Sequence, residues 1–347
     1  GGNPYHHHQD LNRLRRAWAK PETIIVHEAA WNATARLADI VLPATTTLER
    51  NDIGASSRDS YIFAMQQAIA PVGSARNDFD IFHELAARGG HESAFTDGRD
   101  SQAWIRTIYD KLRGQASGHG LDFPGFEAFW EKGHLYVPPP AKPFVLFEDF
   151  RADPTKHALK TPSGKIELYS ERIASFGYAD MPPHPSWLPP VEWLGSAKAD
   201  RHPLHLITIQ PPDRLHSQLD HTPQVRHHKV AGREKLWMNA ADAAKRVIAN
   251  GDLVRVYNDR GSCLAGVEID ARVMPGVAVI STGAWYDGDS DGGIERHGNP
   301  NVLTIDMGTS TLSQAPAALS LLVEIARWTG AVPPLRIDTP PELVAAA

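Results

Sequence analysis

A densely polar segment directly follows one of the apolar runs of this chain. Residues 210–218 read Gln-Pro-Pro-Asp-Arg-Leu-His-Ser-Gln, which combines amide, carboxylate, guanidinium, imidazole and hydroxyl groups without the alternating apolar positions of a further strand. Such donors and acceptors suit a loop that binds a polar ligand. A surface turn with incidental polar residues has the same composition, so the residue types leave both interpretations open.

Two later segments have the chemistry of a phosphate-binding loop. Asn299-Pro300-Asn301 and residues 306–310, Asp-Met-Gly-Thr-Ser, place small residues beside amide and hydroxyl groups. Small residues let the backbone approach a ligand, and successive backbone N–H groups can then bind phosphate oxygens. The pattern favours a cofactor that carries a polyphosphate.

Other classes of site lack their motifs. The sequence contains no G-x-G-x-x-G, G-x-x-x-x-G-K-[ST] or H-E-x-x-H string. The single cysteine, Cys263, lies in an apolar run, which predicts a buried residue and excludes a disulfide or multi-cysteine metal site within these residues. A net charge of −6 gives no basic field for nucleic acid, and no apolar run is long enough for a transmembrane helix.

The first 50 residues predict an α/β layer with a parallel sheet. Apolar residues recur at helical spacing from 10 to 20, and a proline then ends that helix. Apolar runs at 23–26 and 39–42 predict short buried strands, which are typical of parallel sheets. Ligands bind beyond the carboxyl ends of such strands, where residues 27–28 and 44–50 follow.

The middle of the chain gives weaker signals. Residues 78–88 predict a second helix, with Asn77 or Asp78 as its N-cap and two glycines after its end. Prolines then break residues 91–200 into connections, although 161–169 predicts a turn that leads into a strand.

The last part of the sequence predicts strands. Apolar runs at 204–209, 253–257, 263–269 and 277–280 are separated by tight turns, with one helix predicted at 239–247. Short strands with one short helix favour a barrel-like domain. We therefore predict three parts: a partial α/β cofactor-binding domain over 1–90, an irregular or helical connecting region over 91–200, and the barrel over 201–347.

Long segments of the sequence resemble, in the same order, the dimethyl sulfoxide reductase family of molybdenum enzymes. The segments 1–10, 33–46 and 49–52 resemble the third domain of its S- and N-oxide reductases, and 214–219, 258–261 and 301–310 resemble their C-terminal domain. The segments 263–266, 281–285 and 297–301 look closest to the biotin sulfoxide reductases. This resemblance implies a partial, Rossmann-like α/β layer followed by a barrel of the double-psi type.

The resemblance also implies a cofactor, bis(molybdopterin guanine dinucleotide) molybdenum, in which two dinucleotides hold one metal atom. A carboxylate can pair with guanine, and an arginine with phosphate. One dinucleotide would contact Asn3, His7, Glu28, Arg50 and Asp78, and the other would face Gln210, Arg214, His216, Ser217, Asn301 and Gln314.

The same resemblance places the catalytic centre outside this chain. In the family, the serine that ligates molybdenum and the substrate-facing aromatic residues belong to the N-terminal part, and none corresponds to a residue here. The sequence has no initiator methionine, so we expect it to begin inside a longer protein whose N-terminal part is its partner. We expect no catalytic residue or metal ligand in this chain, and no activity from it in isolation.

The functional prediction is therefore a fragment of an S- or N-oxide reductase. A biotin sulfoxide-like or methionine sulfoxide-like substrate would lose its oxygen as water after the transfer of two electrons and two protons. The alternatives are a non-catalytic cofactor-binding fragment and a molybdopterin oxidoreductase of the formate dehydrogenase or nitrate reductase type, which four clustered upstream cysteines would reveal. The sequence leaves the electron donor and the oligomeric state open, and the cytoplasm is favoured over the periplasm.

Overall fold

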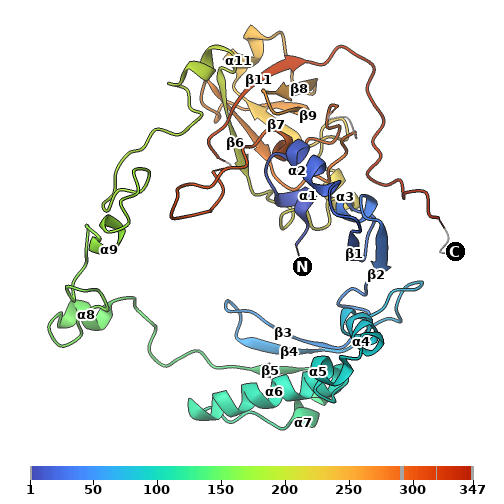
Figure 1. Cartoon of the computed structure of the whole chain (residues 1–347), viewed down its shortest axis with the longest axis vertical. Coiled ribbons are helices and arrows are strands. Elements are labelled where there is room, and N and C mark those ends of the chain that lie inside the picture. The colour runs from blue at the N-terminus through green and yellow to red at the C-terminus, as the bar shows by residue number, and fades with distance from the viewer. Residues whose placement is uncertain (1, 290–292, 318, 345–347) are drawn as a thin grey trace. The chain divides into compact units, whose positions relative to one another are not determined.

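The computed structural model describes residues 2–289, 293–317 and 319–344 (Figure 1). The chain forms two compact units whose segments alternate along the sequence. Unit 1 comprises Gly1–Ile24, Trp31–Ala38 and Leu159–Ala347, and unit 2 comprises Ile25–Ala30 and Asp39–Ala158. The division of the sequence at residues 90 and 200 stays a prediction.

Two parallel strands open unit 2, where the apolar runs predict them. β1 (Ile25–Glu28) and β2 (Ile40–Pro43) pair with Glu28 opposite Pro43, so both carboxyl ends lie at one edge of this sheet. Beyond β2, Ala44 forms a bridge with Arg76, two residues before α4 (Asp78–Arg88). The predicted helix over 78–88 is confirmed, and its first residue lies close in sequence to this bridge.

The remainder of unit 2 is an antiparallel sheet packed against helices, which the apolar pattern does not reveal. β3 (Asp52–Ala55), β4 (Tyr61–Met65) and β5 (His134–Tyr136) pair in that order. α6 (Ser101–Gly118) and α7 (Phe126–Lys132) supply much of its core, in which the rings of Tyr109 and Phe129 stack 4.4 Å apart. The shorter helices of this unit are α5 (Glu92–Thr96) and α8 (Glu148–Ala152).

Unit 1 is built on a closed barrel. Within the described residues its strands follow the order β10-β6-β11-β8-β9-β7, in which β6–β10 and β7–β9 are parallel pairs. The predicted strands are confirmed, whereas β7 has only four residues and β11 carries two charged residues, so their pattern gives no clear signal. The strands are β6 (Leu204–Ile209), β7 (Lys235–Met238), β8 (Leu253–Tyr257), β9 (Ser262–Ile269), β10 (Val277–Ser281) and β11 (Leu322–Arg327).

Two N-terminal helices pack onto this barrel (Figure 1). α1 (Pro4–His7) and α2 (Leu11–Trp18) place Tyr5 and Leu11 in the barrel's own hydrophobic core, where both are fully buried. Burial of each such side chain stabilises the fold by roughly 1.5–3 kcal/mol. The other helices of unit 1 are α3 (Ala33–Arg36), α9 (Glu171–Ala174), α10 (Pro223–Arg226), α11 (Ala240–Lys245) and the 3₁₀ turns η1 (Ala197–Asp200) and η2 (Pro300–Val302).

The strand predicted within residues 161–169 is wrong. These residues form turns and irregular chain, and the side chains of Ile166 and Leu168 remain exposed. Their apolar and polar alternation has no neighbouring strand, and a strand without a partner gains no ladder hydrogen bonds.

Candidate functional site

Carboxylates gather at the edge of unit 2 where β1 ends. Glu28 is the last residue of β1, and its Oε1 accepts a hydrogen bond from the backbone N–H of Ala29 at 2.9 Å. Asp78 begins α4, and its Oδ1 lies 2.8 Å from Nδ1 of His27, whose ring stacks on Phe82. A carboxylate has about four acceptor positions, so the half-exposed Asp78 can accept further hydrogen bonds from a ligand.

Arg50 lies in a turn after β2, and the preceding residue, Glu49, holds the backbone of this turn in place. The buried Glu49 accepts hydrogen bonds from the backbone N–H groups of Thr46 and Val72, both at 2.6 Å. Arg50 donates to the carbonyl of Thr45 and to the carboxylate two residues further on, each at 3.2 Å. A guanidinium group has five donors, so these contacts leave donors for a phosphate.

Two buried asparagines, one just before η2 and one within it, fix the first helix of unit 1 to this turn. The side-chain amide of Asn299 donates to the Tyr5 carbonyl at 3.2 Å, and that of Asn301 donates to the His6 carbonyl at 3.3 Å. Both asparagines are buried. The predicted ligand residue Asn301 therefore positions the chain that leads into His7, across 295 residues of sequence.

His7 and Gln314 line one open pocket of about 470 Å³. The side-chain amide of Gln314 donates to the Ser310 carbonyl at 3.3 Å, and its Oε1 lies 3.0 Å from the place that a Cβ on Gly308 would occupy. Glycine at this position therefore leaves room for the amide. The pocket is also lined by His8, Gln9, Arg13, Asp306, Met307, Gly308 and Pro316, a set of donors and acceptors that suits a polar ligand. Asn3 lies outside this lining and accepts a hydrogen bond from Thr34.

Arg214 lies inside the protein rather than on the surface of its loop. Its side chain is 2% exposed and donates to the carbonyl oxygens of His216 at 3.1 Å and Thr282 at 3.0 Å. It also pairs with Glu234 at 2.9 Å. Because these partners belong to three separate segments, Arg214 fixes the 210–218 loop against the barrel.

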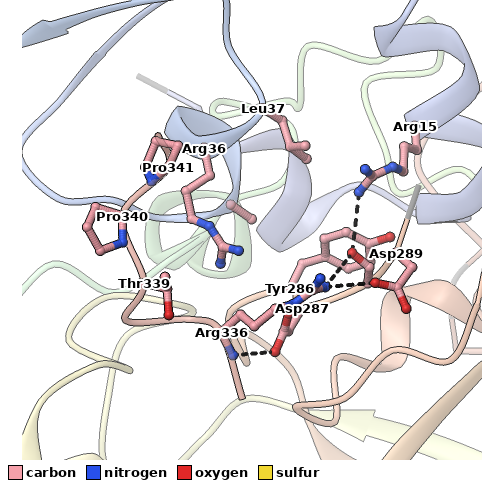
Figure 2. Close-up of a pocket in the computed structure, with 12 residues that line it drawn as sticks. Arg15, Arg36, Leu37, Tyr286, Asp287, Asp289, Arg336, Thr339, Pro340 and Pro341 are labelled. Atoms are coloured by element: carbon pink, nitrogen blue, oxygen red, sulfur yellow. Dashed lines mark hydrogen bonds and ion pairs between the residues drawn. The ribbon is translucent and has the colours of Figure 1, made fainter. Parts of the chain in front are cut away.

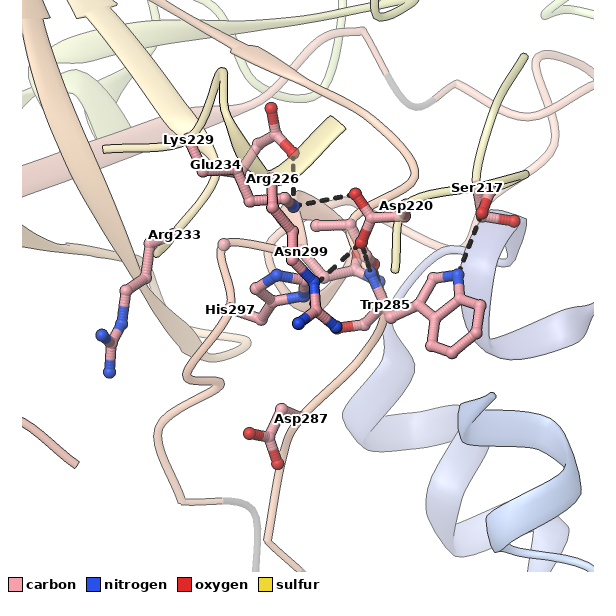
Figure 3. A network of polar contacts seen from close by, with 12 residues as sticks. Ser217, Asp220, Arg226, Lys229, Arg233, Glu234, Trp285, Asp287, His297 and Asn299 are labelled. Carbon is pink, nitrogen blue, oxygen red and sulfur yellow. Dashed lines mark hydrogen bonds and ion pairs between the residues drawn. The ribbon is translucent and has the colours of Figure 1, made fainter. Parts of the chain in front are cut away.

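The partners of Arg214 belong to a buried charge network (Figure 3). Lys229 Nζ lies 2.8 Å from Asp220 and 3.1 Å from Glu234, so two cations alternate with two carboxylates. Asp220 also accepts a hydrogen bond from the Trp285 backbone N–H at 2.9 Å. The cationic neighbours hold the pKa of Asp220 below its usual value, although its burial acts in the opposite direction. The network therefore keeps its carboxylate ionised.

Two further predicted residues lie on the loop that this network supports. His216 has a positive φ of 52° and is exposed, and the Ser217 carbonyl accepts a hydrogen bond from the Trp285 indole N–H at 2.9 Å. His6 of α1 packs on the same tryptophan, because its ring stacks on Trp285. Gln210 is exposed at the end of β6. The structure thus gathers Arg214, His216 and Ser217 in one loop, while their contacts with a ligand stay predictions.

The close approach of this loop to the barrel requires glycine at position 283. Gly283 has a φ of 87°, and a Cβ there would lie 2.1 Å from the His216 carbonyl oxygen. We expect Gly283→Ala to displace the loop and lower the free energy of unfolding by about 2–4 kcal/mol, because steric overlap adds to backbone strain. Gly251→Ala is the matched control, since Gly251 has a φ of 86° but no heavy atom within 4 Å of its added Cβ. Equal losses in chemical denaturation of the two variants would contradict this account.

Sequence reasoning missed the charged residues that hold the loop. Asp220, Lys229 and Glu234 have no recognisable spacing, and the family resemblance implies only a ligand contact for Arg214. The available signal was weak: charged residues lie between the apolar runs of a predicted barrel. Only the fold shows that they meet.

Two family models match the chain. Residues 204–321 match the Molydopterin dinucleotide binding domain, and residues 1–88 match the Molybdopterin oxidoreductase model. The first match covers the barrel strands β6 to β10 and ends just before β11. It includes the 210–218 loop and the His7 pocket residues 306–308, 314 and 316. The second covers Glu28, Arg50 and Asp78.

Curated relatives extend the match over nearly the whole chain. It is 48% identical over 331 residues to biotin sulfoxide reductase of Cereibacter sphaeroides, a match that covers 95% of this chain and 44% of that protein. It is 45% identical to the dimethyl sulfoxide/trimethylamine N-oxide reductase of the same organism, covering 98% and 42%, respectively. The corresponding values for trimethylamine-N-oxide reductase of Salmonella typhi are 45%, 95% and 40%. The chain thus spans less than half the length of these relatives.

A solved structure shares the fold. Acetylene hydratase from Pelobacter acetylenicus superposes with a TM-score of 0.68 over 94% of this chain and 43% of that protein, at 20% sequence identity. At this identity the likeness concerns the fold alone.

Proposed function

We propose, from the premise that this chain belongs to the molybdopterin oxidoreductase family, that it forms a cofactor-binding part of a molybdenum S- or N-oxide reductase. The observation that carries the proposal is the match of residues 204–321, which hold the barrel strands β6 to β10 and their loops, to a molybdopterin dinucleotide-binding domain. The 45–48% identity to S- and N-oxide reductases favours this branch over a formate dehydrogenase or nitrate reductase type.

The side chains of unit 2 fit one end of a guanine dinucleotide. Guanine presents N–H donors along one edge, and the carboxylates of Glu28 and Asp78 are acceptors at the carboxyl edge of parallel strands. Arg50 supplies a cation whose two contacts within the chain leave donors for phosphate oxygens. We assign guanine to the carboxylates and phosphate to Arg50.

The side chains of unit 1 fit a second polar group of the cofactor. The pocket beside His7 and Gln314 offers imidazole and amide groups, and Gly308 leaves space that a side chain would fill. We assign these residues, with His216 and Ser217, to binding, and Asn3 and Asn301 to fixing the backbone around them. Arg214 is a positioning residue in this proposal, because its guanidinium is buried among partners within the chain.

The cofactor, when bound, supplies the two-electron chemistry of oxygen-atom transfer. This chain binds and orients it, and we propose that the rest of the longer protein supplies the metal ligand and the substrate pocket. Biotin sulfoxide or methionine sulfoxide is the proposed substrate class, supported by the 48% identity to a biotin sulfoxide reductase. We place the protein in the cytoplasm, with an electron donor still to be identified. No helix of the described residues is long and apolar enough to span a bilayer.

We also propose the finer fold. The parallel pair β1–β2 is consistent with part of a Rossmann-like layer. The closed barrel with its two parallel strand pairs is consistent with the double-psi type.

The test of this function uses the longer protein that contains the chain. We expect Arg50→Ala to lower molybdenum and pterin content about tenfold when cofactor is limiting, because a charge-assisted hydrogen bond contributes about 1.5–3 kcal/mol and 1.4 kcal/mol is a factor of ten. Arg58→Ala is the control, since Arg58 is an exposed arginine whose side chain makes no hydrogen bond or ion pair with a described residue. Metal analysis and pterin fluorescence measure the loss, and an unchanged Arg50 variant would assign this residue to the turn alone.

The second arm measures activity. The longer protein is expected to reduce biotin or methionine sulfoxide with a reduced dye, and the isolated 347-residue chain is expected to give no turnover. Turnover by the isolated chain would contradict the proposal that the rest of the longer protein supplies the metal ligand and the substrate pocket. Cofactor loading without reduction of either sulfoxide would instead support a different substrate.

A further inference from the structure

A second pocket in unit 1 has an unbalanced charge. It encloses about 300 Å³ between α2, α3, the chain after β10 and the C-terminal segment, and Figure 2 shows the guanidinium groups of Arg15, Arg36 and Arg336 converging on it. None of these residues belongs to the cofactor contacts proposed above. Arginines that converge on a cavity are typical of anion recognition.

The carboxylates around this pocket already pair with Arg336 and with Arg296. Asp287 is fully buried, and its Oδ1 lies 3.0 Å from Arg336 Nε and 3.6 Å from Arg296 Nη1. Asp289 pairs with the same two arginines, at 3.0 Å from Arg336. Two carboxylates and two guanidinium groups therefore balance one another.

Two arginines remain in excess. Arg15 reaches only the Gly288 carbonyl, at 3.5 Å, and contacts Tyr286. Arg36 has no hydrogen bond or ion pair with any described residue, and no dashed line reaches it in Figure 2. Burial lowers the pKa of Arg36, and the neighbouring Arg336 and Arg15 lower it further, although Asp287 opposes them. A half-buried guanidinium without a partner is costly, so an anion bound beside Arg36 would stabilise this pocket.

We propose that this pocket binds the phosphate group of a small phosphate monoester between Arg15 and Arg36. A phosphate dianion offers oxygens that match the planar donor pairs of arginine and balances two positive charges. At roughly 30 Å³ per water-sized group, the cavity holds about ten non-hydrogen atoms, which exceeds phosphate alone. The apolar side chains of Leu37, Pro340 and Pro341 line the rest of the space and can pack against the organic part.

The test is isothermal titration of the full chain with glycerol 3-phosphate, inorganic phosphate and glycerol, in a chloride buffer of constant ionic strength. We expect saturable binding of both phosphates, tighter for the ester, and no binding of glycerol. Arg36→Gln is expected to weaken binding by about tenfold or more. Arg16→Gln is the control, because Arg16 is an exposed arginine beside Arg15 on α2 and does not line the pocket.

A second readout separates binding from folding. Arg36→Gln is expected to leave the melting temperature of the ligand-free chain unchanged or to raise it, because it removes an unpaired charge, and to abolish the stabilisation that phosphate gives to the native chain. Two results for Arg36→Gln would overturn the proposal: a lower melting temperature than that of the native chain without ligand, or phosphate binding as tight as that of the native chain. The absence of saturable binding of either phosphate by the native chain would also overturn it. Equal affinity for the two phosphates would keep the anion site and assign it to free phosphate. Molybdenum content of the longer protein tests the proposed function separately, since Arg36 is not among its cofactor contacts.

Discussion

Replacing Asp220 by alanine is expected to lower the free energy of unfolding of unit 1 by about 3–5 kcal/mol, the cost of leaving a buried charge without its partner. Asp220 is 0% exposed and lies 2.8 Å from Lys229 Nζ and 3.4 Å from Arg214 Nε. Without its carboxylate, two cations share Glu234 where water does not reach. Chemical denaturation followed by circular dichroism measures the loss.

The control for this prediction is an exposed ion pair of the same unit. Asp338 pairs with Arg226, both largely exposed, so Asp338→Ala is expected to cost less than about 1 kcal/mol. The double variant Asp220→Asn with Lys229→Met removes one charge of each sign and is expected to be more stable than the sum of its single changes. Additive single effects, or equal losses for Asp220→Ala and Asp338→Ala, would show that the network contributes little stability.

Acid is expected to destabilise unit 1 from about pH 6.5 downward, because two buried histidines resist protonation in the folded chain. Burial lowers the pKa of His297 to about 3 and that of His6 to about 4, from an ordinary value of 6.5. Above pH 6.5 both forms of the chain hold these rings neutral, and below it the unfolded chain takes up protons first. Each ring therefore removes about 1.4 kcal/mol of stability per pH unit as the pH falls below 6.5 toward its folded pKa.

A buried carboxyl group acts in the opposite direction. Glu295 is fully buried, and burial raises its pKa to about 7 although four backbone N–H groups donate to it. Its raised pKa adds stability as the pH falls from 7 to 4.5, because the folded chain takes up this proton first. Two histidines outweigh one carboxyl group, so a net loss of about 1.4 kcal/mol per pH unit is expected between pH 6.5 and 4.5.

Denaturation midpoints measured between pH 5 and 7.5 test this balance. His297→Asn keeps a side-chain donor for the Trp285 carbonyl, which His297 Nδ1 contacts at 2.8 Å, and is expected to flatten the pH dependence by one proton. His228→Asn, an exposed histidine in the same unit, should keep the native slope. A slope that His297→Asn leaves unaltered would mean that His297 is protonated alike in both states.

The sequence predicts elements best where one residue type dominates. The runs at 23–26, 39–42, 204–209, 253–257 and 277–280, which overlap β1, β2, β6, β8 and β10, are visible because most of their residues are apolar or β-branched. β11 carries Glu324 and Arg327 within six residues, which interrupts its apolar run. The strands β3 to β5 are partly exposed, so their sequences show neither an apolar run nor a clear apolar and polar alternation. Turns at 161–169 alternate like a strand but lack a partner, which only the tertiary structure shows.

Site chemistry is less predictable than the elements that carry it. The residue types of the 210–218 loop indicate a polar function, but the direction of Arg214 depends on Glu234 and Thr282, which lie 20 and 68 residues away. The excess charge of the second pocket is equally hidden, because Arg36 and Arg336 are ordinary arginines until the fold brings them together. Charge balance is a property of the assembled site and leaves no local pattern.

The hydrogen bond between Asn299 and the Tyr5 carbonyl joins residues 294 positions apart, and this separation affects how the protein is made. At about 5–20 residues per second, a ribosome takes roughly 15–60 s to synthesise the chain between these partners. During that time Tyr5 and Leu11 have no barrel core to enter. Unit 2, whose segments end at residue 158, can fold within the same interval. The His7 pocket is therefore assembled last, so its ligand must be bound after synthesis of the barrel rather than during it.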